Sequence, residues 1–181
     1  MTRIKVLKRE EMNPEQGQVY DAIKAAGGPV GGPYYAYIRN PKLMRVCQDV
    51  SNTLRDTALS GRERQIATLV AVRHWGAKYP WAVQVRNSLQ AGLDQATIDA
   101  INSRKTPKLD NAREKAVYDL ATELLANKGL SEATYANAEK LFGVEQLVAV
   151  VATIGWFCMV SCTANAFDIT PPDDAPARIA L

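Results

Sequence analysis

The chain contains a single histidine, His74, among its 181 residues, and only three cysteines, Cys47, Cys158 and Cys162. One imidazole and scattered carboxylates provide no ligand spacing for a bound metal. An odd number of cysteines in apolar helical surroundings does not fit a disulfide framework. We therefore expect neither a metal site nor structural disulfides, and a location in the reducing cytoplasm.

Long runs of like charge are also absent, because 22 basic and 19 acidic residues are spread along the chain and give a formal net charge of +3. A nucleic-acid interface needs clustered basic residues that follow the phosphate backbone, so no nucleic-acid partner is expected. Residues 1–11 mix basic and apolar side chains and lack the continuous apolar core of a signal peptide. Export is therefore not predicted.

One uncharged stretch runs from Gln146 to Phe167, and its 22 residues match the length of a membrane span. Polar residues and a glycine interrupt it, and no basic cluster flanks either end. We predict a buried core helix and no membrane partner. In a chain this short, such a helix often lies partly at a subunit interface, so a homo-oligomer is expected.

Strand-like alternation of apolar and polar residues is missing over any useful length, whereas helical signals recur. Capping residues and prolines precede apolar positions at helical spacing, and glycines end several runs. The predicted helices begin at or just after Asn13, Asn40, Ser60, Pro80, Asp94, Asp110, Ser131 and Gly143. This pattern predicts one all-α domain of about seven to eight helices, with its core at residues 13–170, a short basic N-terminal arm and a mobile tail at residues 173–181.

Apolar stripes on these helices predict which side chains face the core. The least obvious of the expected core positions are Leu43, Val46 and Val50 after Asn40, Leu89 after Pro80, and Tyr135, Ala138 and Leu141 after Ser131.

The segment at residues 59–84 reads LSGRERQIATLVAVRHWGAKYPWAVQ, and its most specific part combines Arg-Glu-Arg with Trp75, Gly76, Tyr79 and Trp81. It resembles the signature helix pair of the carboxymuconolactone decarboxylase and alkylhydroperoxidase-D superfamily. The resemblance extends over roughly residues 30–170. It implies a helical protomer, assembly into trimers or hexamers, and a pocket around this helix pair near a subunit interface.

The chain departs from the family at its functional positions. The resemblance places the two redox cysteines of peroxidase members at Ala77 and Pro80, a histidine at Gln84 and a glutamate at Gln65. A hydroperoxide reductase needs a nucleophilic thiolate and a resolving thiol, which alanine and proline do not supply. Glutamine likewise has no titratable proton for acid catalysis. Thiol peroxidase chemistry by the family route is therefore not expected.

Four polar residues are candidates for a catalytic role. His74 offers the only imidazole and is placed to replace the lost acid-base group, although a lone histidine before Trp75 also fits a structural role. Arg73 follows Gln65 by about two turns on roughly the same helix face and offers a bidentate clamp for a carboxylate, or else a surface salt bridge. Gln65 and Gln84 offer hydrogen bonds to a carbonyl or lactone oxygen, or are relics of a lost site.

Aromatic residues with a polar group are candidates for substrate binding. Tyr34 follows a glycine-rich loop, while Tyr79 and Trp81 flank Pro80 at a predicted helix start. Such side chains suit a planar or cyclic metabolite, and core packing is the alternative explanation for each.

These features predict a cofactor-free lyase of the decarboxylase type, acting on a small cyclic or aromatic-derived carboxylic acid or lactone. Loss of carbon dioxide beside a carbonyl needs charge stabilisation of an enolate and later delivery of a proton. A non-catalytic ligand-binding or assembly protein on the same scaffold is the alternative, and peroxidase activity is a third, less favoured one.

Overall fold

The computed structural model describes residues 2–175 and 178–180, and all regular structure within these ranges is helical. The all-α prediction is therefore confirmed. After a 3-10 turn at Arg9–Glu11, the helices are α1 Pro14–Ala25, α2 Tyr34–Tyr37, α3 Pro41–Arg55, α4 Gly61–His74, α5 Lys78–Gln90, α6 Gln95–Asn102, α7 Ala112–Asn127 and α8 Glu132–Ala166.

Helix starts follow the capping signals in the sequence. In five of the predicted caps, a side-chain oxygen accepts a hydrogen bond from a backbone N–H of the first turn, which satisfies one of the unpaired donors there. One cap differs from the prediction: Asn111, and not Asp110, caps α7, through Arg113 N and Glu114 N. The predicted caps that form are Asn13, Asn40, Ser60, Asp94 and Ser131.

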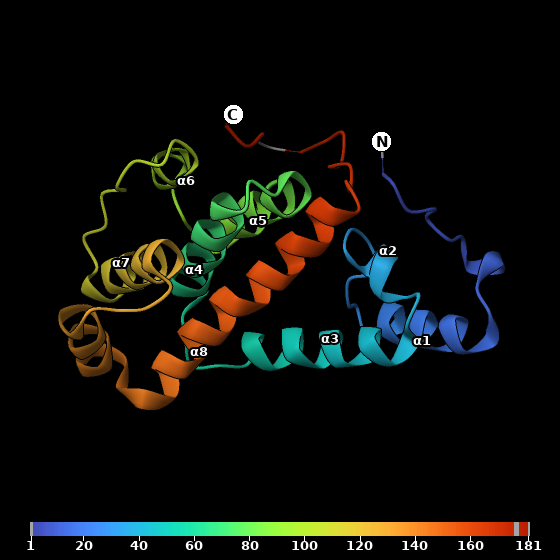
Figure 1. Ribbon diagram of the computed structural model, residues 1–181, viewed down its shortest axis with the longest axis horizontal. Helices are drawn as coiled ribbons and strands as arrows, with labels where there is room; N and C mark the ends of the chain where they lie inside the picture. The colour runs from blue at the N-terminus through green and yellow to red at the C-terminus, as the bar shows by residue number, and fades with distance from the viewer. Residues whose placement is uncertain (1, 176–177, 181) are drawn as a thin grey trace.

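Helix α4 lies at the centre of the main core, where it packs against α5, α7 and α8. Its apolar residues Ile66, Leu69 and Val72 are completely buried, as predicted. Figure 1 shows α8 running diagonally across the molecule, with α4 to α7 on one side of it and α1 to α3 on the other. A second apolar cluster joins α1, α2 and α3 to Trp156 and Val160 of α8.

Helix α8 combines the two helices predicted on either side of Gly143, where the backbone bends at φ 67° and ψ 165°. It is long and apolar enough to cross a membrane, and 44% of its most apolar window is buried in the protomer. The prediction of a core helix holds for one face only. Val150 and Ile154 are buried, whereas Val144 and Val148 are about 60% exposed.

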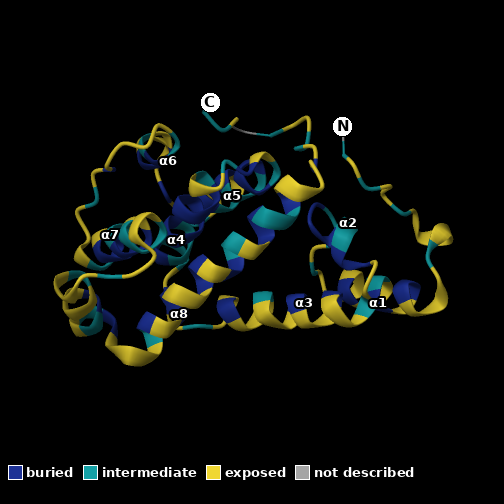
Figure 2. Ribbon diagram, viewed as in Figure 1, coloured by how far each residue is buried: buried dark blue, intermediate teal, exposed yellow. Residues whose placement is uncertain are grey.

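Several other expected core positions are exposed in the protomer. On α3, Leu43, Val46 and Val50 face away from the cluster that buries Cys47 and Leu54, as the exposed stripe along α3 in Figure 2 shows. Leu89 and Tyr135 are also exposed, while Ala138 is buried as predicted and Leu141 is partly buried. Periodicity identified apolar faces correctly, but it did not show whether another helix of the same chain covers them.

The segment after Pro171 contacts the helical body, although its sequence predicts a mobile tail. Asp174 accepts a hydrogen bond from Arg86 at 3.0 Å. The Asn102 side chain donates to the carbonyl of Arg178 and accepts from the N–H of Ala180. The described part of the tail therefore lies along α5 and α6, and residues 176, 177 and 181 lie outside the described residues.

Candidate functional site

A cavity of about 600 Å³ lies where α3, α4, α5 and α8 meet beneath the glycine-rich loop before α2. Each helix contributes residues at helical spacing, so one face of each helix points to the same space. This volume lies within the range of sites for small-molecule ligands. The cavity is therefore the candidate functional site.

Helix α4 contributes Gly61, Arg64, Gln65 and Thr68 to the cavity wall, and its residues 66–72 are all buried. The Thr68 side chain is completely buried, and its hydroxyl has no hydrogen-bond partner. Buried hydroxyls are nearly always paired, because leaving one unpaired costs free energy. An unpaired hydroxyl in a cavity wall is free to form a hydrogen bond with a ligand or with water.

Helix α5 presents Tyr79, Gln84 and Asn87 to the same space. The Gln84 amide oxygen accepts a hydrogen bond from the Asn87 Nδ2 at 3.2 Å. On α4, the Gln65 amide oxygen accepts one from the Ser88 hydroxyl at 3.0 Å. Each glutamine oxygen therefore accepts one hydrogen bond, and both NH₂ groups remain as donors for a ligand oxygen.

The glycine-rich loop is shaped by the ring of Tyr79. A Cβ atom at Gly32 would lie only 2.1 Å from Tyr79 Cε1, and the backbone there has φ +65°. Both features require glycine, which has no side chain and readily adopts positive φ. The loop therefore lies directly on Tyr79 and leads into α2, whose first residue, Tyr34, lines the cavity.

The charged groups of the cavity are both arginines. Arg64 Nη1 donates to the carbonyl of Arg55 at 3.1 Å and to those of Leu54 and Leu59 at 3.5 Å, so it caps the end of α3. Arg55 donates to the Asn52 side chain at 2.5 Å. Among the described residues neither arginine forms a salt bridge, and none of those that line the cavity is acidic. The site therefore favours an anion.

The tyrosines stay protonated at neutral pH. Burial raises the pKa of Tyr79 above its ordinary value, and the nearby Tyr35 raises it further. Burial also raises the pKa of Tyr34, and Ser51 partly offsets that effect. Both phenols are therefore hydrogen-bond donors and potential proton donors in the site.

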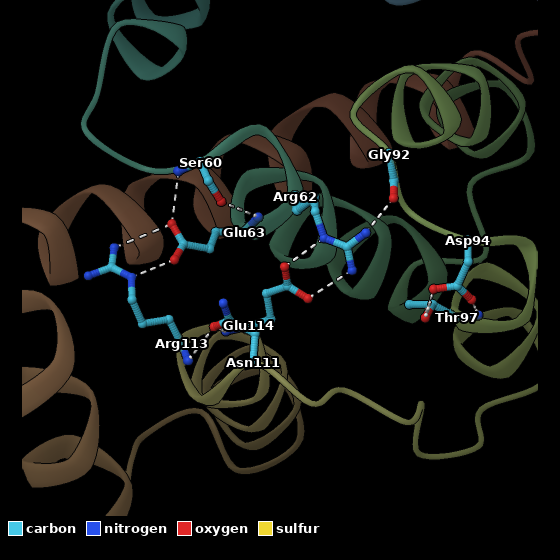
Figure 3. Close-up of polar contacts among 9 residues, drawn as sticks. All are labelled: Ser60, Arg62, Glu63, Gly92, Asp94, Thr97, Asn111, Arg113 and Glu114. Atoms are coloured by element: carbon cyan, nitrogen blue, oxygen red, sulfur yellow. Dashed lines mark hydrogen bonds and ion pairs between the residues drawn. The ribbon is translucent and has the colours of Figure 1, made fainter.

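The three residues of the Arg-Glu-Arg sequence at the start of α4 have different roles. Arg62 and Glu63 form ion pairs with α7, and Arg64 lines the cavity. Figure 3 shows the Arg62 guanidinium against the Glu114 carboxylate, with Nε and Oε1 2.6 Å apart, and the Glu63 carboxylate against Arg113 at 2.5 Å. These reciprocal ion pairs join the first turns of α4 and α7. Both carboxylates are buried, at 5% exposure for Glu63 and 6% for Glu114. The two ion pairs fix the start of α4, and Arg64, the residue after Glu63, lines the cavity.

The structure brings together four of the seven predicted site residues: Gln65, Gln84, Tyr34 and Tyr79 all line the cavity. Trp81 does not, because it is completely buried in the main core beside the helix pair. For Trp81 the alternative of core packing is therefore the correct one.

Arg73 and His74 lie away from the cavity, in a separate hollow formed by α4, α6 and α7. Arg73 is eight residues after Gln65, so its side chain is rotated by about 80° and lies about 12 Å further along the helix axis. The expectation that the two share a helix face is wrong. Arg73 Nε instead donates to the carbonyl of Asn102 at 2.5 Å.

The two positions that the resemblance assigns to redox cysteines, Ala77 and Pro80, lie at the start of α5. Ala77 is buried at the start of α5, and Pro80 lines the cavity. All three cysteines are free thiols, and none of them is among the described residues of the cavity wall. Within the described residues no group of three or more metal-ligating side chains comes together.

Sequence reasoning missed Arg55, Arg64, Thr68 and Asn87. Thr68 lies three residues after Gln65 and four after Arg64, so helical spacing from Gln65 would have found Thr68, and the same spacing from Thr68 would have found Arg64 of the Arg-Glu-Arg motif. Arg55 had no comparable signal, because its place depends on how the end of α3 packs against α4.

Three solved structures have the same fold. An uncharacterised peroxidase-related protein from Silicibacter sp. TM1040 aligns with a TM-score of 0.79 and 19% identity, covering 99% of this chain and 96% of its own. A peroxidase-related protein from Ralstonia eutropha JMP134, described as having an alkylhydroperoxidase AhpD core, aligns at 0.76 and 17%, covering 96% and 93%. A protein of unknown function from Agrobacterium tumefaciens, described as a putative antioxidant defence protein AhpD, aligns at 0.70 and 18%, covering 80% and 100%.

No protein-family model matches the chain, and no curated protein gives a match. At 17–19% identity the likeness to these structures concerns the fold. It extends over nearly the whole chain and includes the helix pair α4 and α5 on which the resemblance was based. The chain has the alkylhydroperoxidase AhpD-like fold.

Proposed function

We propose that this protein binds a small organic carboxylate with a cyclic or aromatic body in the cavity between α4 and α5. The proposal rests on one observation: Arg55 and Arg64 line the cavity together with aromatic side chains, and none of the described lining residues is acidic. Tyr79, Trp156 and Phe157 provide aromatic walls. Arginine binds planar carboxylates well, and aromatic rings favour a planar apolar body.

The polar groups suggest how such a ligand is oriented. Its carboxylate would pair with the guanidinium groups, and a carbonyl or lactone oxygen would accept from the free NH₂ groups of Gln65 and Gln84. A further polar group of the ligand would pair with the buried hydroxyl of Thr68. A keto acid or an unsaturated lactone acid offers all three features.

We further propose a cofactor-free lyase reaction on this ligand. The bond between the carboxylate carbon and the ring breaks, carbon dioxide leaves, and the electron pair moves onto a neighbouring carbonyl oxygen as an enolate. The amide and guanidinium donors stabilise that negative charge. Tyr79 replaces His74 as the proposed proton donor to the ring carbon, because His74 lies outside the cavity and Tyr79 lines it.

A binding protein without catalysis is the second candidate. Its support is that the cavity wall contains no histidine, cysteine, lysine or carboxylate among its described residues. The two tyrosines with raised pKa values are then ligand-binding groups only.

Calorimetric titration with a panel of cyclic keto acids and lactone acids tests the binding proposal, and mass spectrometry of the same mixtures tests turnover. We expect at least one acid to bind, and an Arg64→Gln variant to bind it at least about tenfold more weakly. Arg45→Gln is the matched control, because Arg45 is an exposed arginine of α3 outside the cavity. Binding with product formation supports the lyase, and binding with an unchanged ligand supports the second candidate. No binding by any acid of the panel would count against both.

Peroxidase activity remains the least supported function, although two of the similar structures are described as peroxidase-related. A thiol peroxidase needs a reactive cysteine in its site, and none lines this cavity within the described residues. We expect the purified protein to consume no hydroperoxide in the presence of a dithiol reductant. Consumption that persisted without Cys47, Cys158 and Cys162 would show that the thiol argument does not decide the question.

A further inference from the structure

A second hollow of about 240 Å³ lies on the opposite face of α4 from the cavity. Helix α4 contributes Arg73 and His74 to it, the turn after α6 contributes Arg104, and α7 contributes Tyr118 and Thr122. Aliphatic side chains of α4, α6 and α7 form its floor. None of this set belongs to the proposed carboxylate site.

The two arginines of this hollow have no anionic partner. Arg104 makes no side-chain hydrogen bond or ion pair among the described residues, and Arg73 uses only its Nε, toward the Asn102 carbonyl. Acidic residues on α6 and α7 are engaged elsewhere: Asp99 with Gln95, Glu114 with Arg62, Asp119 with Lys115, and Glu123 with Ser131 and Thr134. No carboxylate of the neighbouring helices therefore neutralises the hollow.

The positions of the arginines leave their donors available. The bond from Nε to Asn102 fixes the Arg73 guanidinium, and both of its terminal nitrogens remain unpaired within the described residues. Arg104 sits in the left-handed turn after α6, with φ 56°, and its backbone N–H donates to Ile101. Burial lowers the pKa of Arg73, and the positive charge of Arg104 lowers it further, so the two like charges repel each other.

We propose that this hollow binds a phosphate group, with Arg73 and Arg104 as the charged contacts and the Thr122 hydroxyl as a further donor, while the Tyr118 hydroxyl donates to the Lys105 carbonyl at 3.5 Å. A doubly charged tetrahedral oxyanion relieves the repulsion between the two guanidinium groups and offers several acceptor oxygens to donors on α4, α7 and the turn after α6. The hollow is smaller than the usual range for sites that enclose a whole metabolite, which favours a compact head group. Free phosphate and a phosphorylated metabolite share this chemistry.

Titrating the protein with inorganic phosphate, and separately with glycerol phosphate, tests the proposal when the ionic strength is held constant with sodium chloride. The unfolding temperature is followed by circular dichroism, because a ligand that binds only the folded state raises it in a saturable manner. We expect saturation in the millimolar range and at least about tenfold weaker binding in Arg104→Gln. Arg104 is exposed and unbonded, so this variant is expected to fold. Arg45 is an exposed arginine outside both cavities, so Arg45→Gln is the control and is expected to respond like the wild type.

The outcomes separate this site from the proposed carboxylate site. A response that is lost in Arg64→Gln and kept in Arg104→Gln would place the phosphate in the cavity between α4 and α5 and overturn the proposal. A response that does not saturate, or that is equal in all variants, would be a general salt effect and would overturn the proposal. A saturable response to only one of the two compounds, lost in Arg104→Gln, supports the site and identifies whether free phosphate or a phosphate ester is its ligand.

Discussion

Arg62, Glu63 and Arg64 are consecutive, yet each has a different partner, two of them on α7 and one at the end of α3. Arg62 binds Glu114 of α7, Glu63 binds Arg113 of α7, and Arg64 reaches the carbonyls at the end of α3. Neighbouring residues on a helix point about 100° apart, so a run of three charged residues contacts several neighbours at once. Only Arg64 lines the cavity, and the other two hold α4 in the position that places it there.

Thr68 allows a residue-scale test of the candidate site. Its buried hydroxyl has no partner in the protein, so Thr68→Val is expected to keep the stability of the unliganded protein or raise it by up to about 1 kcal/mol. The same variant is expected to weaken binding of the carboxylate ligand. Urea unfolding measures the first effect and calorimetry the second.

Thr153 is the matched control for this substitution. It is equally buried and lines the same cavity, but its hydroxyl donates to the Ala149 carbonyl at 2.8 Å. Thr153→Val removes a satisfied hydrogen bond and is expected to lower stability by about 1 kcal/mol. Equal destabilisation by both substitutions would show that the Thr68 hydroxyl is paired in the free protein.

At the scale of elements, the ion pair between Glu63 and Arg113 joins α4 to α7. Glu63→Gln leaves the guanidinium group of Arg113 without its charged partner. We expect a loss of about 1–3 kcal/mol in the free energy of unfolding. Asp119→Asn, which breaks an exposed pair within α7, is expected to cost less than about 0.5 kcal/mol. Comparable losses in the two variants would argue against a structural role for the buried pair.

The same pair predicts a dependence of stability on pH. Burial alone would raise the pKa of Glu63, but the hydrogen bonds from Arg113 and Ser60 outweigh it and hold the pKa below its ordinary value. A lowered pKa in the folded state contributes stability that is complete above the pKa of the unfolded chain and is lost as pH falls through the folded value. The difference in unfolding free energy between wild type and Glu63→Gln should therefore shrink in acid, below about pH 4. A constant difference from pH 7 to pH 3 would contradict this assignment.

The bend in α8 depends on a single glycine. Gly143 has φ 67° and ψ 165°, a conformation that residues with a Cβ rarely adopt, although an added Cβ would meet no neighbouring atom. Gly143→Ala is therefore expected to destabilise the fold by about 1–3 kcal/mol through backbone strain alone.

Gly155 provides the comparison within the same helix. It has a helical conformation and open space around its Cα, so Gly155→Ala is expected to stabilise the protein by up to about 1 kcal/mol. Thermal unfolding of the two variants measures the contrast. Opposite signs support the bend as a fixed feature of α8, and equal signs would refute it.

For the whole molecule, the exposed apolar faces of α3 and α8 support the predicted homo-oligomer. Val144, Val148 and Val151 form one exposed patch on α8. Apolar patches of this kind commonly mark protein interfaces. We expect light scattering to report a mass above that of the monomer, and Val148→Glu to shift it toward the monomer.

Asn137→Glu adds the same charge at another exposed position of α8 and should leave the assembly unchanged. A monomeric wild type at micromolar concentration would contradict the prediction of an oligomer.

The sequence predicted the local features of this fold and part of its site. Ser60 caps α4 with Glu63 as its partner, and Asp94 caps α6, because these bonds join residues three positions apart. Gln65, Gln84, Tyr34 and Tyr79 were found because the family resemblance identified the helix pair. Arg73, His74 and Trp81 were misplaced, because their position depends on which neighbouring helix covers each face of α4 and α5.

By itself, the sequence determined that this chain is helical, where most of its helices begin, and that Ala77 and Pro80 cannot act as a thiol pair. Those properties depend on side-chain chemistry and on hydrogen bonds within one helical turn. Only the tertiary structure decided that Arg55 and Arg64, rather than Arg73, provide the charge of the main cavity, and that Arg73 meets Arg104 in a second hollow. These groupings join residues from different helices, and the packing of α3, α6 and α7 around α4 brings them together.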